Sequence, residues 1–385
     1  MKLSYKLLLL SPFVAFGAFA AEPQNGSGEI DGYKLVWQDL FDGEALNPAR
    51  WNIEVNGDGG GNNELQYYTD REENVRVGDD GEGNRCLILT ARREQYNNKN
   101  FTSGRVNSMN KIAFTHGKVE ASIKLPKTAN GLWPAFWMMG NDFRQVGWPK
   151  CGETDIMEMG NSEGIAHNTQ ERFFNGACHW GQAWPNASYA KSTTKSYSLQ
   201  DGEFHLFTCI WDENSFSMYV DLDKMPQQNP YFKMDIPQDD PDNEWSAGNY
   251  FHKDNFILFN LAVGGNFTGI HNAENITALN DENDQEACYY INYVKIYQKG
   301  EDNDHQDFAD AGDLDPAAIE TLMAVTDFSI DFKEKKIIGQ PPVVLYTLDG
   351  KTLKESFKGE LSFDDIQPGL YIAKASNVAK KVFIR

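Results

Sequence analysis

Three carboxylates lie within the six residues Glu153 to Glu158, in the run Glu-Thr-Asp-Ile-Met-Glu. Their neighbours are β-branched or apolar, which predicts a strand for this segment. Carboxylates this close repel one another and resist burial, so stability alone does not favour them. Two carboxylates held at a fixed separation are what the hydrolysis of a glycosidic bond requires.

The spacing of these acids conflicts with a regular strand. Side chains alternate between the two faces, so Glu153 and Asp155 share one face. Glu158 lies five positions from Glu153 and would point to the opposite face. A β-bulge at Ile156 or Met157 adds one residue and restores the parity, and bulges are frequent next to active sites. We therefore predict a bulge there.

With the bulge, the three acids occupy alternate steps along one face. The outer Cα atoms are then about 13 Å apart, four rises of roughly 3.3 Å. Two Glu side chains that lean inward can bring their carboxyls to about 5–5.5 Å, the separation used by glycosidases that retain anomeric configuration. Glu153 and Glu158 become the candidate nucleophile and acid/base, and Asp155 can hold their pKa values apart. The alternative is an ordinary strand with solvated acids on both faces.

The elements around this run are short strands and turns. From Tyr33 to Gln298 several segments alternate with period two, and long helical patterns are missing. Clusters of Gly, Asn and Asp separate the segments. The pattern predicts an all-β sandwich of roughly 265 residues. The clearest predicted strands are 86–90, 118–125, 206–211, 256–263 and 289–297.

Composition limits the partners. The 385 residues carry a formal net charge of −21, which argues against nucleic acid and acidic membrane surfaces and, more weakly, against sulphated polysaccharides. The nine Trp residues supply flat indoles that can stack on sugar faces. A neutral substrate suits this charge best, and we expect a monomer.

The N-terminus has the pattern of a secretory signal. Lys2 and Lys6 precede an apolar stretch, and Ala18-Phe19-Ala20 is a small-residue cleavage site. We predict a signal peptide over residues 1–20 and export to the periplasm, the cell surface or the medium. The alternative, an uncleaved anchor, has too short an apolar stretch. No other stretch could span a membrane, so no membrane insertion is expected.

Composition changes after the sandwich. We predict an acidic linker over residues 300–327, with a short helix at 316–325, because this run is rich in Asp and poor in aromatics. A small β domain is predicted over 328–385, with strands at 343–347, 370–374 and 381–385. A hairpin turn is predicted at 348–351, where the sequence contains Asp-Gly.

The five cysteines are an odd number at wide spacing, with no Cys-x-x-Cys pattern. Buried apolar thiols are one interpretation, and up to two disulfides of undefined pairing are the other.

The run Glu-x-Asp-x-x-Glu, within Trp148 to Glu158, resembles the catalytic signature of glycoside hydrolase family 16, in its bulged, laminarinase-like branch. Other matching segments follow in the right order over about residues 33–298. They are 63–68 (Asn-Glu-Leu-Gln-Tyr-Tyr), 102–106 (Thr-Ser-Gly-Arg-Val), 116–120 (His-Gly-Lys-Val-Glu), 131–138 (Gly-Leu-Trp-Pro-Ala-Phe-Trp-Met), 178–181 (Cys-His-Trp-Gly), 260–265 (Asn-Leu-Ala-Val-Gly-Gly) and 293–297 (Tyr-Val-Lys-Ile-Tyr).

The resemblance implies a concanavalin-like β-jelly roll over residues 28–299, with a concave substrate cleft for internal cleavage of neutral β-glucans, either β-1,3 or mixed β-1,3/1,4. It makes Glu153 the nucleophile, Glu158 the acid/base and Asp155 the assisting acid, with no cofactor for catalysis. Further site residues follow by match. Sugar-stacking positions match Trp133, Trp137 and Trp148, polar positions in the glycone half of the cleft match Asn63 and Arg105, and a His near the acid/base matches His179.

Several alternatives stay open. Core packing is the alternative role for each Trp, and a surface or structural role for the polar residues. A non-catalytic glucan-binding lectin, an agarase, a carrageenase and a transglycosylase are the rival functions on the same fold. Such lectins typically lose the catalytic Glu.

Two departures from the family pattern stand out. Leu40 follows Asp39 where the family often has Glu. Asn292 stands where the family commonly has an Asp that binds calcium, and an amide oxygen binds calcium more weakly. The sequence therefore leaves a structural calcium ion at Asn292 open.

The C-terminal unit is similar to the sorting domains of the Bacteroidetes-type secretion pathway. This similarity implies a contact with secretion machinery. A small carbohydrate-binding or spacer module is the alternative.

Overall fold

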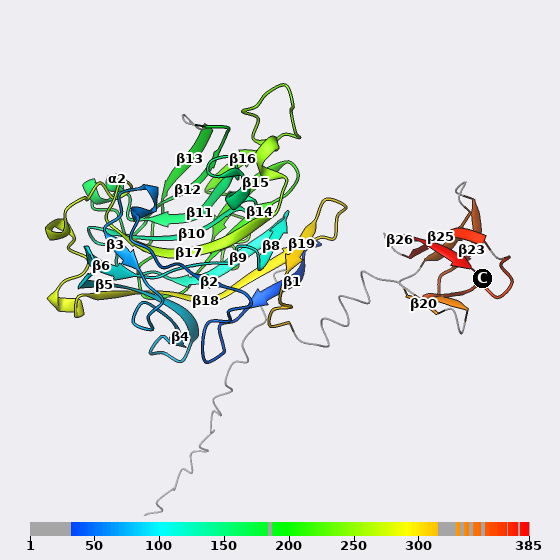
Figure 1. Ribbon diagram of the computed structural model, residues 1–385, viewed down its shortest axis with the longest axis horizontal. Coiled ribbons are helices and arrows are strands. Elements are labelled where there is room, and N and C mark those ends of the chain that lie inside the picture. The colour runs from blue at the N-terminus through cyan, green and yellow to red at the C-terminus, as the bar shows by residue number, and fades with distance from the viewer. Residues whose placement is uncertain are drawn as a thin grey trace, which may run out of the picture.

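The computed structural model describes residues 32–183, 187–314, 329–331, 335–338, 342–347, 351–367, 369–375 and 378–384. Two sheets make up the larger unit, and they pack face to face around one core (Figure 1). The predicted all-β sandwich is confirmed, as are additional strands at the C-terminus. The predicted signal peptide, residues 1–20, lies outside the described residues.

The first sheet has ten strands in the order β16-β15-β14-β9-β18-β5-β6-β3, with β1 on β18 and β4 on β5. Its strands are β1 (Lys34–Asp39), β3 (Gln66–Tyr68), β4 (Val75–Asp79), β5 (Arg85–Tyr96), β6 (Lys99–Ser103), β9 (Gly117–Lys124), β14 (His205–Trp211), β15 (Ser215–Val220), β16 (Phe232–Asp235) and β18 (Glu286–Gln298).

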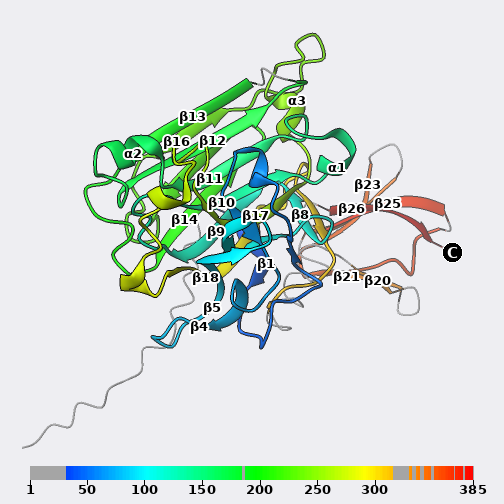
Figure 2. The same cartoon turned by 60° about the vertical axis from the view of Figure 1, so that its left-hand side comes forward.

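The second sheet has nine strands in the order β13-β12-β11-β10-β17-β7-β2, with β8 on β17 and β19 on β8. Its strands are β2 (Asn52–Ile53), β7 (Arg105–Asn107), β8 (Ile112–Thr115), β10 (Leu132–Gly140), β11 (Glu153–Met159), β12 (Phe173–Trp180), β13 (Ala187–Thr194), β17 (Asn255–Val263) and β19 (His305–Phe308). Figure 2 shows β11 between β10 and β12.

Short helical turns connect the strands. They are η1 (Gly59–Gly61), α1 (Phe143–Val146), α2 (Ser162–Ala166), α3 (Gly248–Phe251), η2 (Ala273–Asn275) and η3 (Asp281–Asn283). Within the described residues, no helix is long and apolar enough to cross a membrane.

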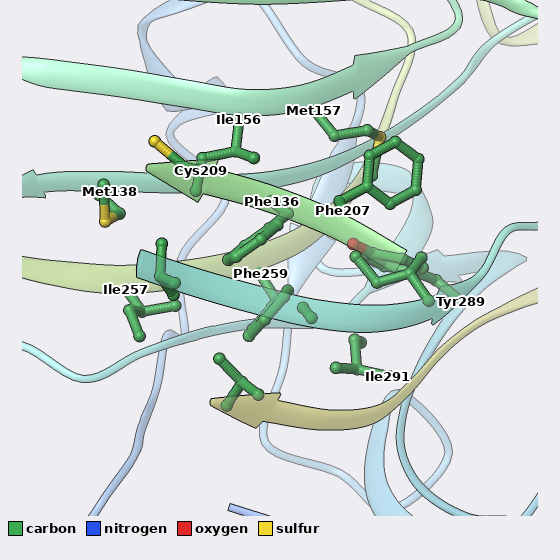
Figure 3. Packing of buried hydrophobic residues seen from close by; sticks show 14 of the residues in the cluster. Phe136, Met138, Ile156, Met157, Phe207, Cys209, Ile257, Phe259, Tyr289 and Ile291 are labelled. Carbon is green, nitrogen blue, oxygen red and sulfur yellow. The ribbon is translucent and has the colours of Figure 1, made fainter. Parts of the chain in front are cut away.

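The core lies between the two sheets. Phe136 and Phe259 stack with ring centroids 4.9 Å apart, and Ile156 and Met157 of β11 are fully buried beside them (Figure 3). The five clearest predicted strands are confirmed as β5, β9, β14, β17 and β18. All five thiols are unpaired, and four of them are buried, which favours the interpretation as apolar core residues.

The predicted boundary between sandwich and acidic linker, at residue 299, is too early. β19 extends the second sheet by pairing with β8. Arg50 then binds Asp310 at 2.6 Å and Asp313 at 2.7 Å. The acidic run looks like a linker in sequence because this basic partner lies some 260 residues upstream. The predicted helix at 316–325 lies outside the described residues.

The C-terminal unit consists of two small sheets. One is β20 (Ser329–Asp331), β21 (Lys336–Ile338) and β24 (Glu360–Ser362). The other has the order β23-β22-β25-β26, with β22 (Val343–Tyr346), β23 (Thr352–Ser356), β25 (Gly369–Ala375) and β26 (Val378–Ile384). A separate core that includes Val343, Leu345 and Phe363 holds it together. The predicted strands of this unit are confirmed, and β22 pairs with β23. Residues 348–350 of the predicted turn lie outside the described residues.

Candidate active site

A β-bulge in β11 brings the three acids onto one face. Against β10, Phe136 pairs with Met157 and Trp137 pairs with Asp155, so Ile156 has no partner. Against β12 the register also slips between Asp155 and Glu158. Ile156 and Met157 are consecutive, yet both side chains are fully buried in the core. The predicted bulge is confirmed, and the opposite surface, which carries Glu153, Asp155 and Glu158, is called the carboxylate face below.

Asp155 lies at the centre of this group and binds His179. The His179 Nε2 atom is 3.3 Å from Asp155 Oδ2, and His179 pairs in register with Glu153. One ligand atom from each of Glu153, Asp155 and His179 lies within 4.8 Å of the others. In the described part of the chain, this is the one group of three His, Cys, Asp or Glu residues close enough to share a metal ion. The sequence placed His179 near Glu158, whereas its direct contact is with Asp155.

Glu158 is held by an indole. The Trp133 Nε1–H group donates to Glu158 Oε1 at 3.2 Å. The Trp133 ring stacks on Phe267 with centroids 4.6 Å apart and planes 14° apart, and only 8% of Trp133 is exposed. One ring face of Trp133 is therefore already covered. On the other side of Glu158, Asn175 of β12 pairs in register with it, and its Oδ1 atom is buried without a hydrogen-bond partner.

Burial raises the pKa of all three acids, and the charges of neighbouring acids add to the shift at Glu153 and Glu158. Burial first, and then the charge of Asp155, raise the pKa of Glu153 to about 8. Burial likewise raises the pKa of Asp155, and burial with Asp155 and Glu153 raises that of Glu158 well above its usual range. Glu153 has His179, Arg105 and a hydrogen bond from Trp148 to oppose the shift. Because Glu158 has fewer such partners, we expect Glu153 to ionise first.

Arg105 of β7 organises the neighbouring strands. Its guanidinium lies 4.9 Å from the ring centre of Trp137, and its Nε atom is 3.0 Å from Glu54 Oε1. Trp137 Nε1–H donates to Asn260 Oδ1 at 2.8 Å. The hydroxyl of buried Tyr68 lies 3.4 Å from the Asn260 amide nitrogen. A connected set of charged, amide and aromatic groups thus leads from β7 across β17 to β10.

Comparisons with known proteins identify the family of this chain. The family Glycosyl hydrolases family 16 matches residues 62–245. A glucan endo-1,3-beta-glucosidase from Cryptopygus antarcticus is 34% identical over 264 residues, which are 66% of this chain and 86% of that protein. The chain belongs to glycoside hydrolase family 16.

Two further comparisons bear on detail. A solved Bacteroides ovatus structure, described as a mixed linkage glucan PUL (MLGUL) GH16 in complex with a G4G4G3G product, is 41% identical. It covers 68% of this chain and 100% of its own, with a TM-score of 0.59. A glucan endo-1,3-beta-glucosidase A1 from Niallia circulans is 30% identical over 70% of this chain. The chain spans only 38% of the length of that relative.

The remaining predicted site residues of this family 16 chain are placed as follows. Trp148 is 45% exposed, and its ring centre lies 6.4 Å from that of His179. Asn63 is exposed in a left-handed backbone conformation, and its amide donates to Asn266 Oδ1 at 3.0 Å. The structure therefore brings Trp148 to the acids but gives Asn63 only a loop contact.

Asn292 lies at a register shift of β18, and its amide donates to the Arg85 carbonyl at 2.8 Å. It is outside the one group of metal-binding side chains in the described residues. A calcium ion at Asn292 stays a prediction.

Sequence reasoning overlooked several residues of the site. Glu54, Tyr68 and Asn260 belong to the Arg105 set, and Phe267 covers Trp133. Tyr68 and Asn260 were within matching segments but had no charge or spacing to mark them. Buried Glu64, beside the singled-out Asn63, accepts from the Tyr68 hydroxyl at 3.0 Å. An acid in a segment of aromatics was the available signal for Glu64.

Proposed function

We propose that this protein is a retaining endo-β-glucanase that cleaves internal β-1,3 or mixed β-1,3/1,4 bonds of neutral β-glucans. The observation that carries the proposal is the bulge, which brings Glu153, Asp155 and Glu158 to one face of the sheet. The relatives described as glucan endo-1,3-beta-glucosidases and the mixed linkage glucan structure support a β-glucan substrate.

The proposed reaction is a double displacement. The Glu153 carboxylate attacks the anomeric carbon while protonated Glu158 gives its proton to the glycosidic oxygen, and the leaving sugar departs as an alcohol. A covalent glycosyl ester on Glu153 results. Ionised Glu158 then takes a proton from water, whose oxygen attacks the anomeric carbon and releases Glu153. The reaction consumes one water and regenerates both carboxyl groups, so no cofactor is needed.

The surrounding groups suit these roles. The hydrogen bond from Trp148 and the positive charge of Arg105 favour the ionised form of Glu153. Trp133 donates a hydrogen bond to Glu158, and the neighbouring negative charges hold the proton of Glu158. Asp155, bound to His179, lies between the two Glu residues in the strand and keeps their proton affinities coupled.

We also propose the organisation of the whole chain. Residues 1–20 direct export, the catalytic domain begins near residue 28 and extends to at least Asp313, and residues up to 327 connect it to the 328–385 domain. The sequence of that domain supports a role in sorting by the secretion machinery. A mass measurement on exported protein shows whether residues are removed at either end of the chain. We expect the loss of residues 1–20.

Product analysis tests the substrate class. Laminarin, mixed-linkage β-glucan, cellulose and agarose are incubated in parallel, and reducing ends and oligosaccharide sizes are measured. We expect internal cleavage of laminarin, of the mixed-linkage glucan or of both, with β-configured products at early times, and no release from cellulose or agarose. Binding of glucan without cleavage would favour the lectin alternative, and lengthened products on a sugar acceptor would favour a transglycosylase.

The Glu158→Gln variant tests the acid/base. We expect a loss of about 1,000-fold or more in kcat/KM on polysaccharide, because general acid catalysis contributes roughly that much and a sugar is a poor leaving group. The loss is much smaller on a dinitrophenyl glycoside, whose leaving group needs no proton. Full activity of the variant on polysaccharide would contradict the assignment.

A further inference from the structure

Among the residues that the structure describes, one exposed indole has no assigned role. Trp245 lies in the segment between β16 and α3, and 39% of its surface is exposed. The apolar surface of an exposed Trp side chain is unfavourable in water. A loop is usually more mobile than the strands that it connects. The setting of Trp245 is different because its loop is fastened to the sheet that carries the acids.

Hydrogen bonds from the end of β12 hold the backbone at Trp245. The Trp180 Nε1–H group donates to the Trp245 carbonyl at 2.8 Å. Gln182 donates to the Tyr250 hydroxyl at 3.0 Å, and that hydroxyl donates to the Glu244 carbonyl. These contacts connect the last residue of β12, and a residue two positions beyond it, to the loop, so the backbone that carries the indole is held in place.

A glycine makes room for the ring. Gly181 has a φ of +117°, and a Cβ atom there would lie 2.5 Å from Cζ3 and 2.9 Å from Cε3 of Trp245. The six-membered part of the indole therefore packs directly on the chain at Gly181. Any larger residue at Gly181 would displace the indole. The position of the Trp245 ring, in contact with the chain and partly exposed to solvent, therefore depends on this glycine.

The position of Trp245 relative to the acids follows from the register. Along β12, Asn175 pairs with Glu158 and His179 pairs with Glu153. Trp180 and Gly181 come next, so Trp245 lies just beyond His179. This is the β12 side of β11, whereas Arg105 lies on β7, three strands beyond β11 on the β10 side.

The β12 and β13 strands offer little else for a sugar to stack on. Ala177 pairs with Asp155 and with Ala190 of β13, and Ser188 and Ser192 flank that row. These side chains share the carboxylate face and are small. Among the described residues of these two strands, the one aromatic side chain with the parity of this face is Phe173, which begins β12 beside Gly164, at the end of the strand away from His179. An aromatic surface at the His179 end of these strands therefore has to come from a loop.

We propose that Trp245 is a specificity-determining residue that stacks on a sugar in the leaving-group half of the glucan chain. This inference rests on the proposed function, and in particular on Arg105 marking the glycone half. The other half of the chain then crosses β12 and β13 and reaches the rim where Trp245 is exposed. The indole supplies the apolar contact that Ala177, Ala190 and Ser192 lack.

A comparison of two substrates tests the proposal. One is a soluble β-glucan, whose leaving group is sugar, and the other is a dinitrophenyl β-glucan oligoside, whose leaving group is not. We expect Trp245→Ala to lose about 10-fold more kcat/KM on the glucan than on the dinitrophenyl oligoside, since aromatic stacking contributes roughly a factor of ten. Trp245→Phe recovers most of this difference, and Gly181→Ala reproduces it by displacing the ring.

Controls distinguish a failure of the proposal for Trp245 from a failure of the proposed function. Met225→Ala removes an apolar side chain of similar exposure, 38%, in the turn after β15, and we expect no change on either substrate. Equal losses on both substrates, or none, for Trp245→Ala would overturn the role of Trp245. If the wild type cleaves neither substrate, the proposed function fails. Calorimetry with a glucan oligosaccharide, on the wild type, Trp245→Phe and Trp245→Ala, then still decides whether the indole binds sugar.

Discussion

The two sides of β11 differ in what they offer a substrate. On the β10 side, Arg105, Trp137 and Asn260 are joined to one another and to buried Tyr68. On the β12 side, the carboxylate face carries Ala177, small exposed residues of β13 and an unpartnered Asn175 oxygen. The groups on the β10 side hold one another in place without substrate, whereas the β12 side has few such contacts.

This asymmetry fits a division of labour in a chain-cleaving enzyme. Preorganised charged and aromatic groups position the half of the chain that becomes covalently attached, because misplacement there reduces the rate most. An open half with few contacts lets the first product leave and water enter. The following predictions test that asymmetry, beginning with the side where we expect the larger effect.

Arg105→Gln removes the charge at the centre of the β10 side. We expect a loss of about 100- to 1,000-fold in kcat/KM on both glucan and dinitrophenyl substrates, because Trp137 and Glu54 lose their common partner. The acidic limb of the pH profile also moves to higher pH, since the Arg105 charge lowers the pKa of Glu153. Arg92→Gln, which breaks a half-exposed pair with Glu286 in the other sheet, is the matched control. A loss in kcat/KM below 10-fold for Arg105→Gln would contradict the proposed difference between the two sides of β11.

Asp155→Asn tests the coupling within β11. The charge of Asp155 raises the pKa of both Glu153 and Glu158. A neutral amide therefore lowers both, and we expect both limbs of the bell-shaped kcat/KM profile to move to lower pH, together with a loss of about 10- to 100-fold. Kinetics on a soluble glucan between pH 4 and 10 measure it. Limbs that stay in place would show that Asp155 does not set these pKa values.

Glu153→Gln tests the stability cost of the site. The pKa of Glu153 is about 8 in the folded protein, against about 4.5 when unfolded. A raised pKa means that the folded state holds the proton more tightly, so stability is lost as pH rises from about 4.5 through about 8. We expect the variant to exceed wild type in free energy of unfolding by about 1–3 kcal/mol at pH 8 and to match it at pH 4. Urea unfolding at both pH values checks this, and a difference that is equal at both would exclude titration as its cause.

Ser192→Ala provides the small effect expected of the open side. Ser192 is exposed and shares a row with Asn175 and Glu158. We expect a loss of less than about 3-fold on glucan, because an exposed hydroxyl contributes a water-replaceable hydrogen bond. A loss as large as that of Arg105→Gln would show that both sides bind substrate equally.

The sequence predicted β11 better than it predicted its neighbours. Because Glu158 lies five positions after Glu153, a bulge is the one way for them to share a face of the strand, so the local geometry followed from side-chain parity. The strands followed from their alternating apolar residues. These signals are local and need no knowledge of the partner strand.

Contacts between residues far apart in the sequence could not be predicted in the same way. The acidic run was predicted as a linker because it is rich in Asp and poor in aromatics. Its partner Arg50, which binds Asp310 and Asp313, is far upstream and gives no signal within the run. The Arg105 partner Glu54 lies on a different segment, and Asn260 has no charge. Such contacts depend on strand order across the sheet, which spacing within a segment does not contain.

The covalent intermediate tests the central claim most directly. The protein is incubated with a 2-deoxy-2-fluoro β-glucan oligoside that carries a dinitrophenyl leaving group, digested and mapped by mass spectrometry. The fluorine slows breakdown of the glycosyl ester, so the adduct accumulates. The account predicts one fluoroglycosyl group on Glu153. An adduct on Asp155, Glu158 or His179 would contradict it.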